Sequence, residues 1–182
     1  MLRYFPVAYD DELLYSQIAR YNRHSCSPGW KQTLSELFGS RTVAAVVDLP
    51  AHLGQLQEHT GHITRQSAHD TLWRQTLFPV YAPFLGPDLT DRVKQSMLSG
   101  YGGDIHTRAG LSASSVKRPD RLKVCPECLN EQLQKNGEAY WQRLFQVTGV
   151  LFALYTTASS ELLLCLMFQP ISTTTQQRLH PS

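Results

Sequence analysis

The first segment of the chain carries apolar side chains at helical spacing. Leu14, Ile18 and Tyr21 stand at positions i, i+4 and i+7, which places them on one face of an α-helix. Asp10 has the side chain of a typical helix cap, so we expect the helix to begin there and to run to about Arg23. The apolar face of this helix should pack against a core.

The charges of the same segment agree with this helix. Asp11 and Glu12 would lie in its first turn, and Arg20 and Arg23 would lie in its last turn. A helix dipole favours acidic side chains at the N-terminus and basic side chains at the C-terminus. The four charges therefore match the dipole at both ends of the expected helix.

The pattern continues as a series of short helices separated by breaks, which predicts a mainly α protein. Residues 30–38 are expected to form a helix that ends at Gly39. The order of the first helices is compatible with a helix-turn-helix arrangement, although helical hairpins of this kind also occur in proteins that never bind DNA. Further helices are expected at residues 43–49, 51–59, 63–77, 89–98 and 132–143, and residues 78–85 should wrap the core edge as a proline-punctuated connector.

The run Ser-Gly-Tyr-Gly-Gly at residues 99–103 predicts a flexible break between two units. We expect residues 1–103 to form an N-terminal helical domain of the helix-turn-helix type. Residues 104–156 are then expected to form a small zinc-knuckle element with a basic rim. From residue 157 to residue 182 the chain is rich in Thr, Ser and Gln and poor in charge, so we expect this tail to be poorly ordered.

A pair of cysteines at C-x2-C spacing is the strongest chemical signal in the chain. Cys125 and Cys128 can hold one metal ion from a single turn, with each sulfur about 2.3 Å from zinc. A structural zinc ion needs four ligands, and neither Cys26 nor Cys165 begins a second pair. The ligand set of the expected zinc knuckle is therefore incomplete. A thioredoxin-like redox role would require a preceding βαβ pattern, which the charged sequence before Cys125 does not provide.

A shift of the reading frame would supply the missing ligand pair. Residues 152–155, Phe-Ala-Leu-Tyr, can be encoded by TTT GCC CTC TAC, and an ACN codon follows for Thr156. The same letters, read from the last base of the Phe152 codon, encode Cys-Pro-Leu-His. The restored set of C-x2-C and C-x2-H would be a complete metal site. We interpret the chain as frameshifted near Phe152; the alternative is coincidence, since a protein sequence does not reveal its codons.

The balance of charge is only mildly basic, with a formal net charge of +2 and a pI of about 8.4. Such a balance does not indicate a non-specific nucleic-acid-binding surface, but it permits a local basic patch. Cations gather directly before the cysteine pair, where they would form a rim suited to phosphate oxygens, although each of them singly could belong to a solvated face. The candidate DNA contacts are Lys117, Arg118, Arg121 and Lys123, together with Lys31 and Arg41 near the expected helix-turn-helix.

Several classes of protein are disfavoured by the sequence. No apolar run approaches the roughly 20 residues that cross a bilayer, and the first residues lack the apolar core of a signal peptide, so we expect a cytoplasmic location and no membrane partner. His59 and His62 do not form an H-E-x-x-H motif, and Gly61 should interrupt any helix between them. We therefore do not expect an enzyme. A small metal-dependent hydrolase would need an open zinc site with a general base in reach.

Five sequence motifs, taken together and in order, resemble the TniQ family. The resemblance extends from about residue 3 to residue 152 and depends on the stretches at 5–20, 49–54, 76–84, 125–128 and 137–143. It implies an N-terminal helix-turn-helix region followed by a zinc-binding element with ligands at C-x2-C and C-P-x-H. Only Cys125 and Cys128 match those ligand positions, because Ala153 and Thr156 stand where the second pair would be.

The resemblance also implies a function. Family members that select target sites for transposition bind a double-stranded DNA attachment site and recruit an AAA+ ATPase that activates the transposase, and some relatives work with RNA-guided complexes. We therefore expect a truncated target-site selection protein with DNA and the ATPase as partners. The alternative is a protein–protein adaptor that docks the ATPase or an RNA-guided complex and does not bind DNA itself.

Overall fold

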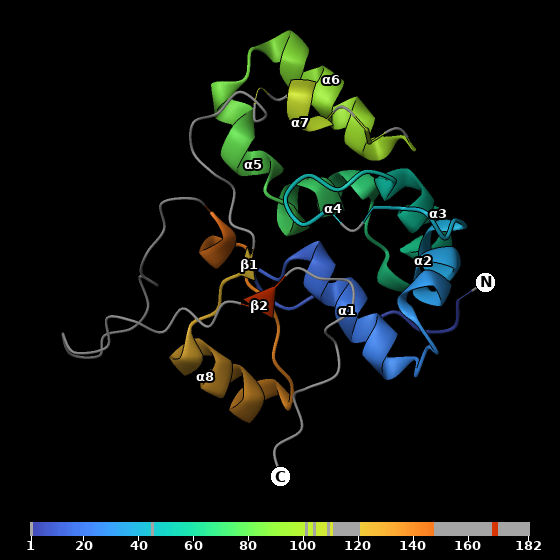
Figure 1. The fold of residues 1–182 in the computed structure, drawn as a ribbon, viewed down its shortest axis with the longest axis vertical. Helices are drawn as coiled ribbons and strands as arrows, with labels where there is room; N and C mark the ends of the chain where they lie inside the picture. The colour runs from blue at the N-terminus through green and yellow to red at the C-terminus, as the bar shows by residue number, and fades with distance from the viewer. Residues whose placement is uncertain are drawn as a thin grey trace, which may run out of the picture.

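The computed structural model describes residues 2–44, 46–100, 102–103, 105–108, 110, 121–147 and 169–170. The described part of the chain is mainly helical (Figure 1), so the predicted α class is confirmed. Its helices are α1 (Leu14–His24), α2 (Trp30–Phe38), α3 (Leu53–Thr64), α4 (Ala68–Gln75), α5 (Phe78–Tyr81), η1 (Ala82–Phe84), α6 (Pro87–Leu98), α7 (Ile105–Arg108), α8 (Pro126–Asn136) and η3 (Leu144–Gln146). None of these described helices is long and apolar enough to cross a bilayer.

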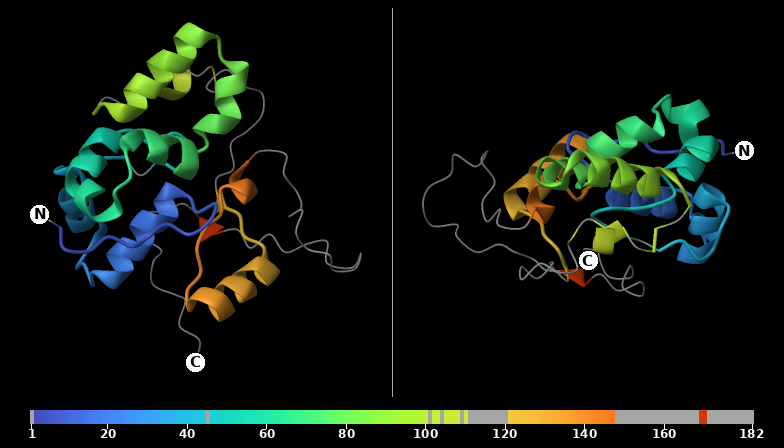
Figure 2. Two further views of the ribbon diagram at one scale, coloured as in Figure 1. Left: turned by 180° about the vertical axis from the view of Figure 1, so that it is seen from behind. Right: turned by 90° about the horizontal axis from the view of Figure 1, so that it is seen from above.

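The helices form two groups on either side of α1. Figures 1 and 2 show α2–α7 together on one side and α8 apart from them, with α1 between the two groups. A two-stranded antiparallel ladder of β1 (Arg121–Leu122) and β2 (Gln169–Pro170) lies close to the start of α8. The helix α1 is therefore the element that both groups share.

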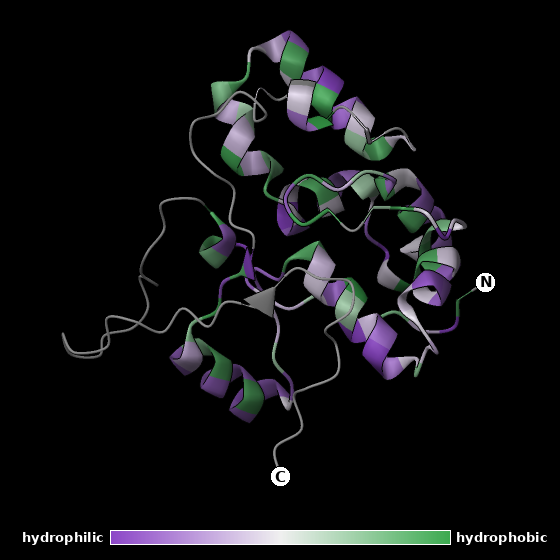
Figure 3. Cartoon of the chain, viewed as in Figure 1, coloured by the Kyte–Doolittle hydropathy of each residue, from purple (hydrophilic) through white to green (hydrophobic). Residues whose placement is uncertain are grey.

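The core lies between α1 and the group α2–α7. Leu14, Ile18 and Tyr21 are buried, so the apolar face predicted for the first helix is confirmed. They join a continuous cluster that includes Leu37, Leu72 and other fully buried side chains of α2, α4 and α6. Each such side chain contributes about 1.5–3 kcal/mol through the apolar surface that it removes from water. Figure 3 shows the corresponding alternation of hydrophobic and hydrophilic residues along α6 and α8.

The start of α1 differs from the prediction. The helix begins at Leu14 after Leu13, whose side chain makes no capping hydrogen bond, so Asp10 is not the cap. Asp11 has a φ of +53°, a left-handed conformation that does not belong to a helix. The predicted first-turn positions of Asp11 and Glu12 are therefore wrong, because the Asp11 carboxylate binds Arg143 and Leu144 far along the chain and the Glu12 carboxylate binds Arg20 near the end of α1.

The second helix is predicted correctly. It spans Trp30–Phe38 and ends at Gly39, which adopts a φ of +67°. A residue with a side chain would be strained in this left-handed conformation, which is why glycine is the common choice at this position. The local sequence signal is sufficient here because the end of the helix depends on one residue.

The next helices have different boundaries from those expected. The described residues between 43 and 49 do not form a helix, and α3 begins at Leu53 and continues through Gly61 to Thr64. Gly61 therefore does not interrupt the helix, since tertiary packing outweighs its roughly 1 kcal/mol propensity cost. The expected helix 63–77 is shortened to α4 because Ser67 and Asp70 form a capping box that begins a new helix.

Two later segments also depart from the expectation. The connector at residues 78–85 contains α5 and η1, and it buries Phe78 completely but leaves Phe84 87% exposed. The expected helix 132–143 is wrong: α8 covers Pro126–Asn136 and ends at Gly137, which has a φ of +73°. A left-handed glycine at this position stops the helix and sends residues 138–143 in a new direction.

The contact between α3 and α6 depends on a close approach of the two backbones. His52 has a φ of +66° and its N–H donates to the carbonyl oxygen of Ser99 at 2.9 Å. A Cβ atom on Gly54 would lie 2.8 Å from the carbonyl oxygen of Leu98, a distance that real Cβ atoms essentially never show. The absence of a side chain at Gly54 therefore permits the first turn of α3 to contact the end of α6.

We predict that Gly54→Ala destabilises the protein by about 1–2 kcal/mol, because overpacking against a backbone atom outweighs the better helix propensity of alanine. Urea unfolding followed by circular dichroism measures the change. Gly103→Ala is the control, since a Cβ atom at that position meets no atom within 4 Å. An unchanged or increased stability of Gly54→Ala would show that the close approach does not constrain the fold.

Candidate functional site

The segment after α8 folds back onto the beginning of the chain. This return segment, residues 137–143, forms an antiparallel bridge between Gln142 and Glu12. The N–H of Leu13 donates to the carbonyl oxygen of Trp141 at 2.9 Å, and the N–H of Arg143 donates to the carbonyl oxygen of Asp11 at 2.9 Å. The return segment is therefore attached by its backbone to the residues that precede α1.

A buried ion network fixes the same contact. The guanidinium of Arg20 on α1 is 2.7 Å from a carboxylate oxygen of Glu12 and 2.8 Å from one of Glu138. His24 adds its Nε2 atom at 2.8 Å from the other Glu138 oxygen. The exposed fractions of the side chains are 8% for Arg20, 0% for Glu12 and 10% for Glu138. These four residues, Glu12, Arg20, His24 and Glu138, are called the ion network below.

Aromatic rings cover the ion network. The hydroxyl of Tyr9 donates to Glu138 at 2.9 Å, and the Arg20 guanidinium lies 4.0 Å from the centre of the Tyr9 ring. The ring of Tyr9 stacks in turn on Tyr140 of the return segment at a centroid distance of 4.8 Å. The rings exclude water from the charges, which strengthens each ion pair but also makes an unpaired charge costly.

The two carboxylates of the ion network have opposite pKa shifts. Burial by itself would raise the pKa of Glu138, but hydrogen bonds from Arg20, Tyr9 and His24 outweigh it and lower the pKa below its ordinary value. Burial raises the pKa of Glu12 above its ordinary value, although Tyr9, Ser16 and Arg20 all donate to its carboxylate. Glu138 is therefore the more firmly ionised partner of Arg20.

A second ion pair connects the return segment to α4. The Nε atom of Arg143 donates to Asp11 at 2.9 Å, and the N–H of Leu144 donates to the other Asp11 oxygen at 2.9 Å. Arg143 also donates to the carbonyl oxygen of Trp73 at 3.0 Å. One arginine therefore connects the return segment, the N-terminal segment and the end of α4.

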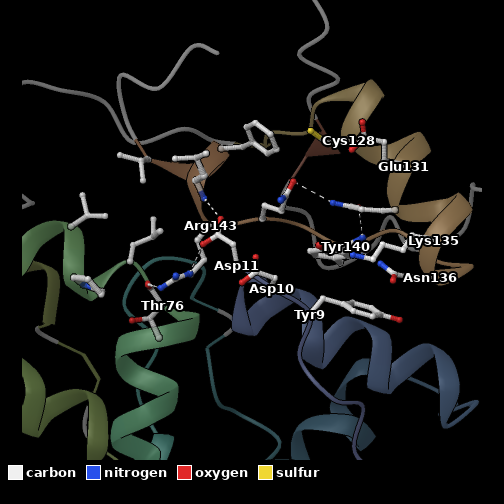
Figure 4. Close-up of a pocket in the computed structure, with 18 residues that line it drawn as sticks. Tyr9, Asp10, Asp11, Thr76, Cys128, Glu131, Lys135, Asn136, Tyr140 and Arg143 are labelled. Carbon is white, nitrogen blue, oxygen red and sulfur yellow. Dashed lines mark hydrogen bonds and ion pairs between the residues drawn. The ribbon is translucent and has the colours of Figure 1, made fainter. Parts of the chain in front are cut away.

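A cavity of about 860 Å³ lies beside this ion pair, between α8 and the α4–α5 junction. Figure 4 shows Cys128 and Glu131 on α8, Tyr9 and Asp10 on the N-terminal segment, and Arg143 with Asp11 between the two sides. The remaining lining residues are Thr76, Leu77, Pro79, Val80, Gln132, Lys135, Asn136, Tyr140, Gln142, Leu144, Phe145 and Val147. The cavity is called the groove below.

The predicted metal ligands lie at the start of α8. Cys125 precedes the helix and Cys128 occupies its first turn, and both are half-buried free thiols. Burial, a hydrogen bond with Cys125 and nearby acidic groups raise the pKa of Cys128 to about 12. Among the described residues, no three His, Cys, Asp or Glu side chains are grouped to hold a metal ion. The described chain thus offers two of the four ligands of a structural zinc site, and positions 153 and 156 lie outside it.

The predicted DNA contacts are only partly described. Lys31 in the first turn of α2 and Arg41 beyond its end are both exposed, at opposite ends of that helix. Arg121 is exposed on β1, whereas Lys123 is half-buried and its N–H donates to the side chain of Gln146 at 3.0 Å. Lys117 and Arg118 lie outside the described residues.

We predict that Glu138→Gln lowers the stability at pH 7 by about 3 kcal/mol, the typical cost of removing one partner from a buried ion pair. Urea unfolding measures the loss. Glu58→Gln is the matched control, since Glu58 is exposed on α3 and surface substitutions change stability by less than about 0.5 kcal/mol.

The pH dependence of this loss is a further part of the test. A carboxylate whose pKa is lowered by folding stabilises the native state above its unfolded pKa of about 4.3, and this contribution disappears as the pH falls through the lower native pKa. The stability difference between Glu138→Gln and the unmodified protein should therefore shrink below about pH 4. An equal difference at pH 7 and at pH 3 would contradict a role for the Glu138 charge.

Comparison with known sequences identifies the family. The sequence pattern of the TniQ family matches residues 3–152. The transposon Tn7 transposition protein TnsD of Escherichia coli is 40% identical to this chain over 142 residues, which cover 78% of this chain and 28% of TnsD. The chain thus spans less than a third of the length of that relative. Because the family pattern covers most of the chain, the chain belongs to the TniQ family.

Proposed function

We propose that the chain takes part in selecting a target site for transposition, by binding a double-stranded DNA attachment site and recruiting the AAA+ ATPase of the transposon. The observation that carries this proposal is the 40% identity to TnsD, a transposition protein, over 78% of the chain. The resemblance to the family implies both partners. The ion network suits such an adaptor, because it joins α1 to the return segment that follows α8 through buried ion pairs.

The proposed DNA-binding unit is the pair α1 and α2. These helices are joined by residues 25–29, a connection close to the short turn of a helix-turn-helix motif, whereas residues 39–52 between α2 and α3 are too many for such a turn. The second helix of the motif is the one that enters the major groove. Lys31 is exposed on α2, and Arg41 is exposed beyond its end. These positions support phosphate contacts at both ends of the helix.

A salt titration tests the basic rim before the cysteines. The logarithm of the affinity for duplex DNA should fall linearly with the logarithm of the salt concentration. The double variant Arg118→Ala and Arg121→Ala should reduce the slope of this line by about 2, because each lost phosphate contact reduces it by about 0.9. Arg92→Ala, an exposed arginine on α6, is the control and should leave the slope unchanged. An unchanged slope in the double variant removes the rim from the proposed interface.

The second candidate function is a protein–protein adaptor that docks an ATPase or an RNA-guided complex without binding DNA. The net charge of only +2 favours this function, since DNA-binding domains are usually far more basic. Absence of any gel shift with the purified chain, together with retention of the ATPase in a pull-down, would select the adaptor function over the DNA-binding one.

We also propose that Cys125 and Cys128 are half of a zinc site whose second half is encoded in the neighbouring reading frame. The fourfold variant Ala153→Cys, Leu154→Pro, Tyr155→Leu and Thr156→His carries the four residues that the neighbouring frame encodes. It should bind zinc at one ion per chain, because four ligands complete the tetrahedron, and the bound ion should raise the melting temperature.

Elemental analysis after dialysis measures the bound zinc. The same fourfold variant with Cys128→Ser is the control and should lose the metal, because three ligands remain. Failure of the fourfold variant to bind more zinc than the unmodified chain would refute the frameshift interpretation of this site. The nucleotide sequence across the Phe152 codon tests the same interpretation independently.

A further inference from the structure

The groove has a different chemical character at its two ends. The residues from the α4–α5 junction and from η3 are largely apolar and include Leu77, Val80 and Leu144. The residues from the N-terminal segment and from α8 include the carboxylates of Asp10 and Glu131. Figure 4 shows Asp10 on the N-terminal segment and Glu131 on α8. A ligand that fills the groove must therefore combine apolar and polar groups.

The polar end of the groove has a surplus of negative charge. Asp11 and Arg143 neutralise each other through their 2.9 Å ion pair, so they leave no net charge. Within the described residues, no hydrogen bond or ion pair is made by the carboxylate of Asp10 or of Glu131, and both residues are exposed. Lys135 is a single cation on the same face of α8. Two free carboxylates against one ammonium group favour a cationic ligand.

The size of the groove indicates the class of ligand. Its volume of about 860 Å³ lies near the upper end of the roughly 300–1,000 Å³ that binding pockets usually have. Such a volume accommodates several side chains of an extended polypeptide and is far larger than a single ion. The side chain of Asn136 lies at the polar end, where its amide can hydrogen-bond with a peptide backbone.

We propose that the groove binds an extended segment of a partner protein that carries apolar side chains at one end and a basic side chain at the other. The apolar side chains would lie against Leu77, Val80 and Leu144, and a lysine or arginine would lie between Asp10 and Glu131. Nucleic acid is disfavoured as the occupant, because the same carboxylates repel phosphate groups. Among the described candidate DNA contacts, none of Lys31, Arg41, Arg121 and Lys123 lines the groove.

Fluorescence anisotropy with labelled nine-residue peptides tests this site on the full chain. The probe has leucines in one half and lysines in the other, and two comparison peptides replace every lysine by glutamate or every leucine by serine. We expect the lysine–leucine peptide to bind at least tenfold more tightly than either comparison peptide, since each lacks one of the two required contacts. Equal binding of the glutamate peptide would overturn the proposal.

Substitutions in the groove show where the peptide binds. Asp10→Asn with Glu131→Gln should weaken the lysine–leucine peptide at least tenfold, and Val80→Asp should do the same from the apolar end. The matched control is Asp88→Asn with Glu58→Gln, which removes the same charge from exposed carboxylates on α6 and α3 that do not line the groove. Circular dichroism confirms that each variant is folded.

Every outcome bears on the proposal. An equal loss in the control variant shows non-specific attraction to surface carboxylates and overturns it. Competition by a duplex oligonucleotide that depends on Asp10 and Glu131 assigns the groove to nucleic acid instead. No binding to the unmodified chain overturns the proposal as well, and it would indicate that other residues of the chain cover the groove. The direct peptide titrations contain no duplex DNA, which is added only in the competition experiment, so their results are independent of the salt titration.

Discussion

The architecture depends on the position of Arg20 between two carboxylates. Glu138 is 118 residues from Arg20 in sequence, yet their side chains are 2.8 Å apart and almost completely buried. The desolvation of such charges costs several kcal/mol per ion and is offset only when each charge has a close partner. Separation of the return segment from α1 would leave Arg20 with Glu12 alone and expose the second carboxylate. The ion network therefore specifies one position of the return segment and makes others unfavourable.

The groove follows from this constraint. Its lining includes Tyr140, Gln142 and Arg143 from the return segment, whose backbone is attached to residues 11–13. Gly137 ends α8 directly before that segment, so the position of α8 is set by the same attachment. The α8 wall of the groove is thus held by the contact between the N-terminal segment and residues 137–143, whereas the α4–α5 wall belongs to the apolar core through Leu72 and Phe78.

The sequence predicts those parts of the fold that depend on local signals. The end of α2 is predicted correctly because Gly39 alone decides it, and the buried face of α1 follows from its apolar spacing. The start of α1 is not predictable in this way, because Asp11 and Glu12 resemble first-turn residues and yet bind Arg143 and Arg20. A helix cap stabilises the fold by about 1 kcal/mol, whereas a buried ion pair that loses a partner costs several kcal/mol. The tertiary contacts of Asp11 and Glu12 therefore determine where α1 begins.

The same reasoning applies to the candidate site. The C-x2-C spacing locates Cys125 and Cys128 from sequence alone, because both ligands belong to one turn. The ion network could not be found from periodicity, since its members come from distant segments and charges usually indicate a solvated face. The one local signal is that Glu138 stands two residues before Tyr140 and three before Trp141. Charged residues beside large aromatic rings are often buried with a partner, and the structure gives Glu138 that partner.

The cysteine pair and the groove share a residue, which relates the two proposals physically. Cys128 belongs to the pair and also lines the groove, one turn before Glu131 on the same face of α8. Ligation of both thiols would fix the first turn of the helix, where Cys128 and Glu131 are neighbours because residues three positions apart lie on one face. On the proposed zinc site, bound metal would therefore also restrict the part of α8 that carries Glu131. A protein that binds a peptide at this helix would consequently bind it more tightly when the first turn is held rigid, because less conformational entropy is lost on binding.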